Sequence, residues 1–166
     1  MPHLAAPSIL APLIAALEKA PDPRRAAFDL LPALLTSTDW LPPNLLTPDP
    51  SAYRRELLHQ APDGRYSIGC FVWSARQATK IHDHTSWGAV GLLTGRLRER
   101  SFILSPAGGL LPAETRVLEP GGRLECGPEE DGIHEVAGLD PLSVSIHIYG
   151  APFDHICRTL YEGGAA

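Results

Sequence analysis

The chain has 166 residues, of which 44% are hydrophobic and 20% are charged, and its formal net charge is −5. This length suits one domain with its own core, and the composition is that of a folded globular protein, which argues against a disordered or membrane protein. Because the acidic excess supplies no positive field for a phosphate backbone, the sequence also argues against nucleic acid as a partner.

The N-terminal segment, residues 1–50, predicts helices that pack on the rest of the chain. Its apolar run has no basic residue in front of it and ends in charged residues, which indicates an amphipathic helix over residues 8–19 and argues against an export signal. Asp22 and Pro23 supply a capping side chain and a first-turn proline for a second helix, in which Pro32 is expected to introduce a kink.

Residues 51–166 predict an all-β unit. The 15 glycines and 17 prolines are spread through the chain, which is typical of short strands joined by turns. Residues 105–113 are expected to form a loop. Short strands with turns at this spacing favour a sandwich, jelly roll or barrel. The expected strands cover residues 53–59, 65–73, 81–84, 87–93, 96–104, 115–118, 123–126, 133–137 and 142–149.

The cysteines suggest neither a disulfide framework nor a thiolate metal site. Cys70, Cys126 and Cys157 are odd in number, far apart and without a Cys-x-x-Cys motif. We therefore expect them to be packed thiols in a reducing compartment, and the predicted location is the cytoplasm.

A pair of histidines on one strand predicts a metal site. Side chains at positions i and i+2 of a strand project to the same face, so His82 and His84 point one way and Asp83 points the other. Imidazole nitrogen suits iron, zinc, copper and nickel, so the pair by itself names no metal. A third ligand is needed, and His134, at the start of a later strand, is the candidate.

A second row of polar side chains lies near the C-terminus. Ser145, His147 and Tyr149 alternate with apolar residues and so share one face of the strand over 142–149. If this face is buried, the three groups must be hydrogen-bonded to one another, since an unpaired buried polar group costs about 1–3 kcal/mol. They would then form a relay that aims the phenol. The alternative is the solvent-facing side of an edge strand.

Together these motifs resemble the thiol dioxygenases, the cupins that include cysteine dioxygenase and 3-mercaptopropionate dioxygenase. A His-x-His pair is common among cupins, but the Ser-x-His-x-Tyr strand is not, and the resemblance covers roughly residues 53–160. It implies a cupin barrel, that is, an RmlC-like jelly roll or double-stranded β-helix, here with N-terminal α-helices in front of it.

The resemblance also implies a cofactor and a reaction. Fe(II) would be held by His82, His84 and His134, and the glutamate that cupins usually carry after the pair is absent here. The family reaction adds both atoms of dioxygen to the sulfur of a small thiol carboxylate and gives a sulfinate. The expected partners are this thiol and O2, with no nucleic acid and no membrane, and the oligomeric state stays open. Ser145, His147 and Tyr149 correspond to the catalytic relay of the family.

A position shortly after the histidine pair separates two types of thiol dioxygenase. In mammalian-type enzymes a cysteine at this point is cross-linked to the relay tyrosine. Here the region reads Trp87-Gly88-Ala89, so the cross-link cannot form at this place and the chain is more similar to the bacterial type.

Three residues are candidates for binding the substrate. Arg55 aligns with the carboxylate-binding arginine of cysteine dioxygenases, whereas Arg158 lies where the 3-mercaptopropionate enzymes carry an arginine. The two arginines therefore point to different substrates. An arginine can bind a carboxylate through two parallel hydrogen bonds. Trp87 is either a wall of the substrate pocket or a core tryptophan.

Two other functions remain open at this point. A three-histidine cupin can carry out another oxygenase reaction or an isomerisation, which would not require the Tyr149 row. A non-catalytic cupin can bind a small acid, and iron analysis with an oxygen-uptake measurement would separate it from the enzymes.

Overall fold

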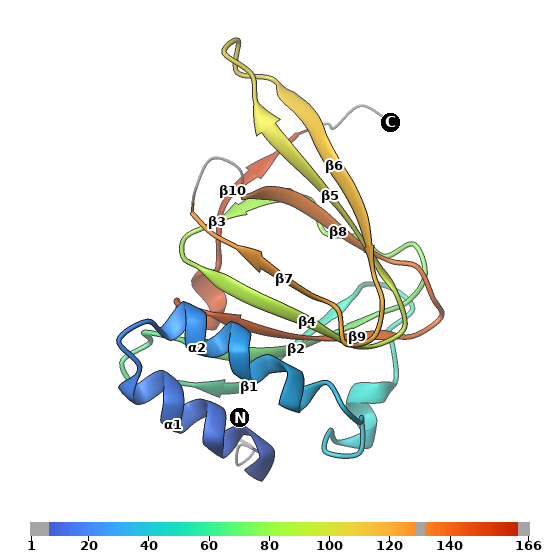
Figure 1. Ribbon diagram of the computed structural model, residues 1–166. Helices are drawn as coiled ribbons and strands as arrows, with labels where there is room; N and C mark the ends of the chain where they lie inside the picture. Colours follow the sequence, from blue (N-terminus) through green and yellow to red (C-terminus); the bar gives the residue numbers. More distant parts are fainter. Residues whose placement is uncertain (1–6, 129–131, 163–166) are drawn as a thin grey trace.

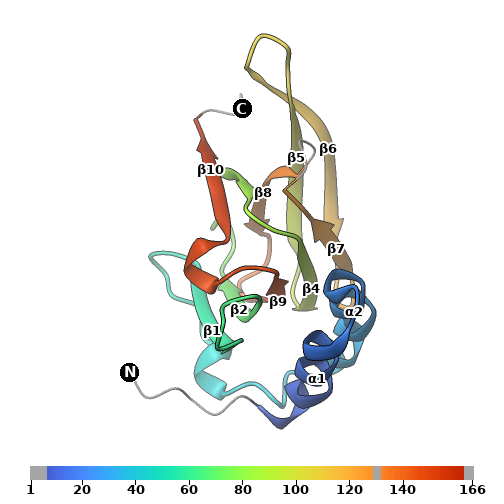
Figure 2. The same cartoon turned by 90° about the vertical axis from the view of Figure 1, so that its left-hand side faces the viewer.

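The computed structural model describes residues 7–128 and 132–162, which form two five-stranded antiparallel sheets with two helices packed beside them (Figures 1 and 2). The first sheet has the order β1-β2-β9-β4-β7 and the second the order β10-β3-β8-β5-β6. The predicted all-β core is therefore confirmed. The strands are β1 (Arg54–Gln60), β2 (Ser67–Trp73), β3 (Ile81–His84), β4 (Gly88–Thr94), β5 (Leu97–Leu104), β6 (Leu110–Leu118), β7 (Arg123–Cys126), β8 (Ile133–Gly138), β9 (Ser143–Tyr149) and β10 (Cys157–Tyr161).

The helices are α1 (Ala11–Lys19) and α2 (Pro23–Leu30). α1 begins later than predicted, because Ser8–Leu10 form a 3₁₀ turn in front of it. The predicted cap of α2 is confirmed, since the carboxylate of Asp22 accepts a hydrogen bond from the backbone N–H of Arg25 at 3.0 Å. Within the described ranges, neither helix has the length and hydropathy that a membrane crossing requires.

Pro32 ends the α-helix, where the sequence predicted only a kink. The helical segment, residues 8–35, then continues in 3₁₀ geometry. α2 stops at Leu30, and Leu31–Leu34 continue as a 3₁₀ helix. Proline has no N–H for the carbonyl four residues earlier, and its ring would clash with that carbonyl in an α-helix. This carbonyl belongs to Phe28 and accepts a hydrogen bond from Arg123 Nη1 at 2.6 Å instead, which ties the helical segment to β7.

The two faces of the first sheet contact different parts of the molecule. On the outer face, apolar residues such as Ile146 and Ile148 of β9 form one buried cluster with Leu31 and other residues of the helical segment. A β-carbon at Gly91 of β4 would lie 2.6 Å from Leu35 Cδ1, so glycine is what allows the helical segment to approach the sheet. Because side chains alternate along a strand, the polar row of β9 faces the space between the two sheets.

Two strands of the second sheet differ from the prediction. β6 includes Leu110–Leu118, although residues 105–113 were expected to be a loop. Pro112 is tolerated there because β6 is the edge strand and pairs only with β5. β10 was not predicted at all. It pairs with β3, with Cys157 opposite His84 and Leu160 opposite His82.

Candidate metal centre and adjoining cavity

Three histidine side chains meet in the space between the two sheets. His82 and His84 come from β3, and His134 on β8 is the antiparallel partner of His82. The ring centroids lie 4.8–4.9 Å apart in all three pairs. One ring nitrogen from each lies within 4.8 Å of the other two, and all three residues are buried. The structure thus brings together the three histidines named from the sequence, in an arrangement that can hold one metal ion.

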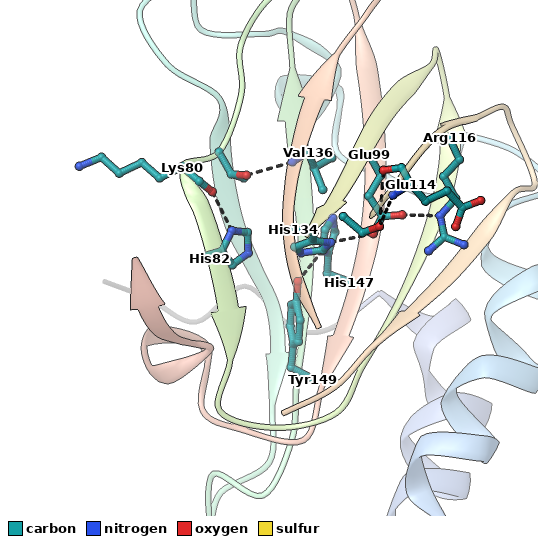
Figure 3. A network of polar contacts seen from close by, with 11 residues as sticks. Lys80, His82, Glu99, Glu114, Arg116, His134, Val136, His147 and Tyr149 are labelled. Carbon is teal, nitrogen blue, oxygen red and sulfur yellow. Dashed lines mark hydrogen bonds and ion pairs between the residues drawn. The ribbon is translucent and has the colours of Figure 1, made fainter. Parts of the chain in front are cut away.

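Two of these imidazoles are oriented by a hydrogen bond at Nδ1 (Figure 3). Nδ1 of His82 lies 2.9 Å from the carbonyl oxygen of Lys80, and Nδ1 of His134 lies 2.7 Å from Glu99 Oε1. Their Nε2 atoms are thereby free to bind a metal. Neither ring nitrogen of His84 makes a hydrogen bond of good geometry within the described ranges, although both are buried and the backbone of nearby Gly132 partly raises the pKa of the ring. A buried, unpaired nitrogen is costly, and a metal ion would satisfy it.

The histidines of β3 are neutral at physiological pH. Burial, together with the neighbouring His134, lowers the pKa of His82 to about 4 and that of His84 to about 2. Only the neutral imidazole has a lone pair for a metal, so the environment keeps both ready to act as ligands.

The polar row on β9 forms a continuous hydrogen-bonded chain. Ser145 Oγ lies 2.8 Å from His147 Nε2, and His147 Nδ1 lies 2.8 Å from the Tyr149 hydroxyl. All three residues are buried, and β9 lies between β2 and β4, so the edge-strand alternative is wrong. The sequence did not reveal a fourth member, Trp73, whose indole N–H donates to Ser145 Oγ at 3.0 Å.

Tyr149 connects this chain to the histidine cluster. Its ring stacks on His84 with the centroids 5.7 Å apart, while Phe71 stacks on His147 at 3.8 Å. Burial raises the pKa of Tyr149 well above its usual value and lowers the pKa of His147 well below its usual value. Both groups are therefore neutral at physiological pH.

A cavity of about 670 Å³ opens beside the cluster and reaches both His82 and Tyr149. Basic side chains stand in its wall, which suits an acidic ligand of small size. The wall includes Tyr53, Arg55, Phe71, Lys80, Ile156, Cys157, Arg158 and Leu160.

The family model described as "Cysteine dioxygenase type I" matches residues 1–161. The chain belongs to this family. Cysteine dioxygenase type 1 of Homo sapiens is 29% identical over 113 residues, which cover 64% of this chain and 54% of the human protein. The Bos taurus protein of the same name is 28% identical with the same coverage. The match covers 54% of each of these curated cysteine dioxygenases, so the chain spans about half of their length.

Solved structures show the fold. A protein with a double-stranded β-helix domain from Klebsiella pneumoniae has a TM-score of 0.52 at 13% identity, covering 73% of this chain and 88% of the other. TT1209 from Thermus thermophilus has a TM-score of 0.51 at 19% identity, covering 66% and 92%. The predicted cupin fold, a double-stranded β-helix with N-terminal helices, is confirmed.

In this member of the cysteine dioxygenase family the two candidate arginines have different partners. Arg55 is exposed to the cavity, donates one hydrogen bond to the carbonyl of Phe153 at 3.0 Å, and lies over the rings of Phe71 and Phe153 at 5.3 and 5.0 Å. Arg158 instead donates two hydrogen bonds to the carboxylate of Asp83, at 3.0 and 2.6 Å. The guanidinium of Arg158 is thus already occupied by an internal carboxylate.

Asp83 faces away from the histidines that flank it, as predicted, and is fully buried. Besides Arg158, its carboxylate accepts hydrogen bonds from the backbone N–H of Thr159 at 2.6 Å and from the Tyr161 hydroxyl at 3.1 Å. Burial by itself would raise the pKa of Asp83, but these donors outweigh it and hold that pKa below its usual range. The aspartate therefore fastens β3 to β10.

Asp83→Asn is expected to reduce the free energy of unfolding by about 1.5–3 kcal/mol at pH 7, because hydrogen bonds to a charged acceptor are lost. A carboxylate with a lowered pKa stabilises the fold above its unfolded pKa of about 4, and this contribution disappears as the pH falls through the lower folded value. Urea denaturation at pH 7, 4 and 3 should show wild type and variant converging at low pH. Asp140→Asn, which removes a more exposed carboxylate paired with Arg96, should have a smaller effect. A gap that stays constant with pH would contradict this role.

Trp87 does not lie with the cavity residues. It is partly buried against the cluster of apolar residues that joins the helices to the first sheet. It also lies close to Gly150, since a β-carbon on that glycine would be 2.2 Å from Trp87 Nε1. Of the two predicted roles, this position corresponds to the core tryptophan.

The cysteines are only partly as expected. Cys70 and Cys126 are buried, and burial raises the pKa of each thiol, but Cys157 is exposed and stands in the cavity wall. The prediction of a packed thiol was wrong for Cys157, because it begins the unpredicted strand β10, whose first four residues are all exposed. A β-carbon at Gly88 would lie 2.4 Å from Cys126 Sγ and 2.7 Å from Tyr149 Cε1, so the structure leaves no room for a side chain there.

Glu99 is a residue near the centre that the sequence did not single out. It is 4% exposed, on β5, and its carboxylate contacts both His134 and Arg116 (Figure 3). Burial would raise the pKa of Glu99, but the hydrogen bonds from His134 and Arg116 outweigh it and keep the pKa below its usual value. The sequence does contain a signal for the burial of Glu99, because this residue lies on the same side of its strand as the apolar Leu97.

Proposed function

We propose that this protein is a non-haem Fe(II) thiol dioxygenase that converts a small thiol carboxylate, cysteine or 3-mercaptopropionate, to its sulfinate. The observation that carries the proposal is that two groups of side chains meet beside one cavity. These groups are the three-histidine cluster and the Ser145-His147-Tyr149 chain, and His82 and Tyr149 line the same cavity. Membership of the cysteine dioxygenase type I family supports the reaction class.

The proposed ligands of Fe(II) are His82, His84 and His134. The donor set fits this ion, because imidazole nitrogen suits iron and the cluster is buried and close enough to converge on one point. A metal would satisfy one of the two His84 nitrogens that lack a hydrogen bond of good geometry, and the backbone of Gly132 lies near the ring. When bound, the ion supplies the centre at which the thiol sulfur and dioxygen react.

Arg55 is the proposed binding group for the substrate carboxylate. It stands in the cavity wall, and its contact with the Phe153 carbonyl involves a single nitrogen, so other N–H groups of the guanidinium can donate to a ligand. Arg158 lines the same cavity but is committed to the buried Asp83. Using it for substrate would leave a buried carboxylate with fewer partners, which is costly.

The hydrogen-bonded chain on β9 holds a proton at the Tyr149 hydroxyl. Since Trp73 already donates to Ser145, the serine hydroxyl can donate to Nε2 of a neutral His147, whose Nδ1–H then donates to the Tyr149 oxygen. In this tautomer the phenol keeps its own O–H free to donate into the cavity. Tyr149 would thus position a proton beside the reacting sulfur and oxygen.

The reaction balances without another reductant, because a thiol and one dioxygen together contain all the atoms of the sulfinic acid. The test is steady-state oxygen uptake by the Fe(II)-loaded protein with cysteine, 3-mercaptopropionate and longer mercapto acids. We expect about one dioxygen consumed per sulfinate formed with at least one of them. No uptake across the panel, or native protein that holds zinc and stays inactive after iron replacement, would favour a non-catalytic acid-binding cupin.

Arg55→Gln is expected to lower kcat/KM for the best thiol carboxylate by about tenfold to a hundredfold, because charge-assisted hydrogen bonds of about 1.5–3 kcal/mol are lost. The matched control is Arg54→Gln, whose guanidinium contacts Asn44 and Thr47 carbonyls and Glu56 instead. Arg158→Gln is the comparison. A large loss of kcat/KM in that variant, with Arg55→Gln near wild type, would reassign the carboxylate to Arg158.

A further inference from the structure

The carboxylate of Glu99 is a buried charged group that the proposed reaction does not use. Glu99 lies on β5 between β8 and β6, and the register places it directly opposite Arg116 of β6. One carboxylate oxygen lies 2.7 Å from His134 Nδ1, and the other accepts a hydrogen bond from Arg116 Nε. Figure 3 shows the glutamate between these two partners.

The three histidines of the cluster thus differ in what lies behind them. His82 has a neutral backbone carbonyl at Nδ1, His84 makes no hydrogen bond to a carboxylate within the described ranges, and His134 has a carboxylate at Nδ1. A carboxylate at Nδ1 fixes the tautomer, prevents the ring from turning over, and makes the opposite nitrogen a stronger donor to a metal. Of the three rings, His134 is the one placed to be the strongest ligand.

Arg116 holds the Glu99 carboxylate in place through an ion pair across the β5–β6 ladder. A buried carboxylate is stabilised by such a cationic partner. The Arg116 side chain reaches Glu99 from the edge strand and is 45% exposed, so it brings a solvated positive charge to a carboxylate that is 5% exposed. The resulting chain runs from the surface through Arg116 and Glu99 to His134.

We propose that Glu99 is a positioning residue of the metal centre, which orients His134 and strengthens its bond to the metal, and that Arg116 holds the Glu99 carboxylate in this position. The inference rests on the proposed metal site, but it concerns metal affinity and does not depend on which reaction the centre performs. One of the three neutral imidazole ligands thus has an anion behind it.

The test is the affinity of the protein for Co(II) or Fe(II), measured by competition with a chelator under anaerobic conditions and without any thiol. Glu99→Gln is expected to bind the metal about 10–100-fold more weakly than wild type. The Co(II) absorption spectrum should also shift, because the donor strength of one ligand changes. Glu135→Gln is the matched control. Glu135 follows His134 on β8 but contacts Arg98 and Arg100, and its variant should keep the wild-type affinity and spectrum.

Thermal unfolding of the metal-free proteins separates positioning from a purely structural role. A structural role predicts a lower melting temperature with unchanged affinity and spectrum in the folded variant, which would overturn the proposal. If Glu99→Gln does not fold, Arg116→Gln is the test. It should weaken metal binding by a smaller factor, and wild-type affinity in this variant would equally overturn the proposal. Because no thiol is present, a protein that fails to oxidise thiols can still pass this test.

Discussion

His84→Ala should abolish tight metal binding and, with it, oxygen uptake in the presence of a thiol carboxylate. The variant leaves two ligands, and we expect the loss of affinity to exceed the roughly 100-fold reached by changes behind a ligand. His84 is the most informative of the three histidines, because it is fully buried and neither of its ring nitrogens makes a hydrogen bond of good geometry in the described part of the chain. Metal content after loading and desalting provides the measurement.

The control for this experiment is His155→Ala. His155 lies in the 3₁₀ helix Phe153–His155 and is exposed, so its loss should change neither metal content nor turnover. Circular dichroism of both variants shows whether the β fold is intact. If a folded His84→Ala protein retains one tightly bound metal and normal turnover, the ion does not lie between these three histidines.

Tyr149→Phe should leave the metal bound but lower turnover of the thiol by about 100-fold or more, the range expected when a positioned proton donor is removed. The substitution keeps the ring that stacks on His84 and removes only the hydroxyl held by His147. Tyr66→Phe is the control, because Tyr66 is equally buried but its hydroxyl bonds Glu18 on the helical side.

The same variant distinguishes the reactions open to a three-histidine cupin. An isomerisation, or an oxygenase reaction without the relay, would leave Tyr149→Phe nearly as active as wild type towards its own substrate. Measuring sulfinate formation and oxygen uptake together decides the matter. Retained sulfinate production with the metal in place would contradict the role given to the phenol.

Local periodicity predicted most of the centre. Alternation along a strand is a geometric property of the backbone, so it placed His82 and His84 on one face, Asp83 on the other, and Ser145, His147 and Tyr149 together. The same rule did not reveal how β3 is held, because Asp83 pairs with residues more than seventy positions later on a strand with weak sequence signal.

Glu99 illustrates a second limit. It lies between Arg98 and Arg100, and a run of alternating charges is usually a solvated face. Only the pairing of β5 with both β8 and β6 shows that this one charge points inwards, where it meets His134 and Arg116. Long-range register decides such cases, and a single sequence does not contain it.

The short strand β3 connects the metal ligands with the wall of the cavity. Its inward side carries His82 and His84, and its outward side carries the aspartate that fastens β10, whose Cys157 and Leu160 belong to the cavity wall. β3 therefore links the metal ligands on one of its faces to the cavity wall through the hydrogen bonds of Asp83 on the other. We expect that a change at Cys157 or Leu160 in the cavity wall can alter the spectrum of a metal held by His82 and His84, because β10 is hydrogen-bonded to the strand that carries both ligands.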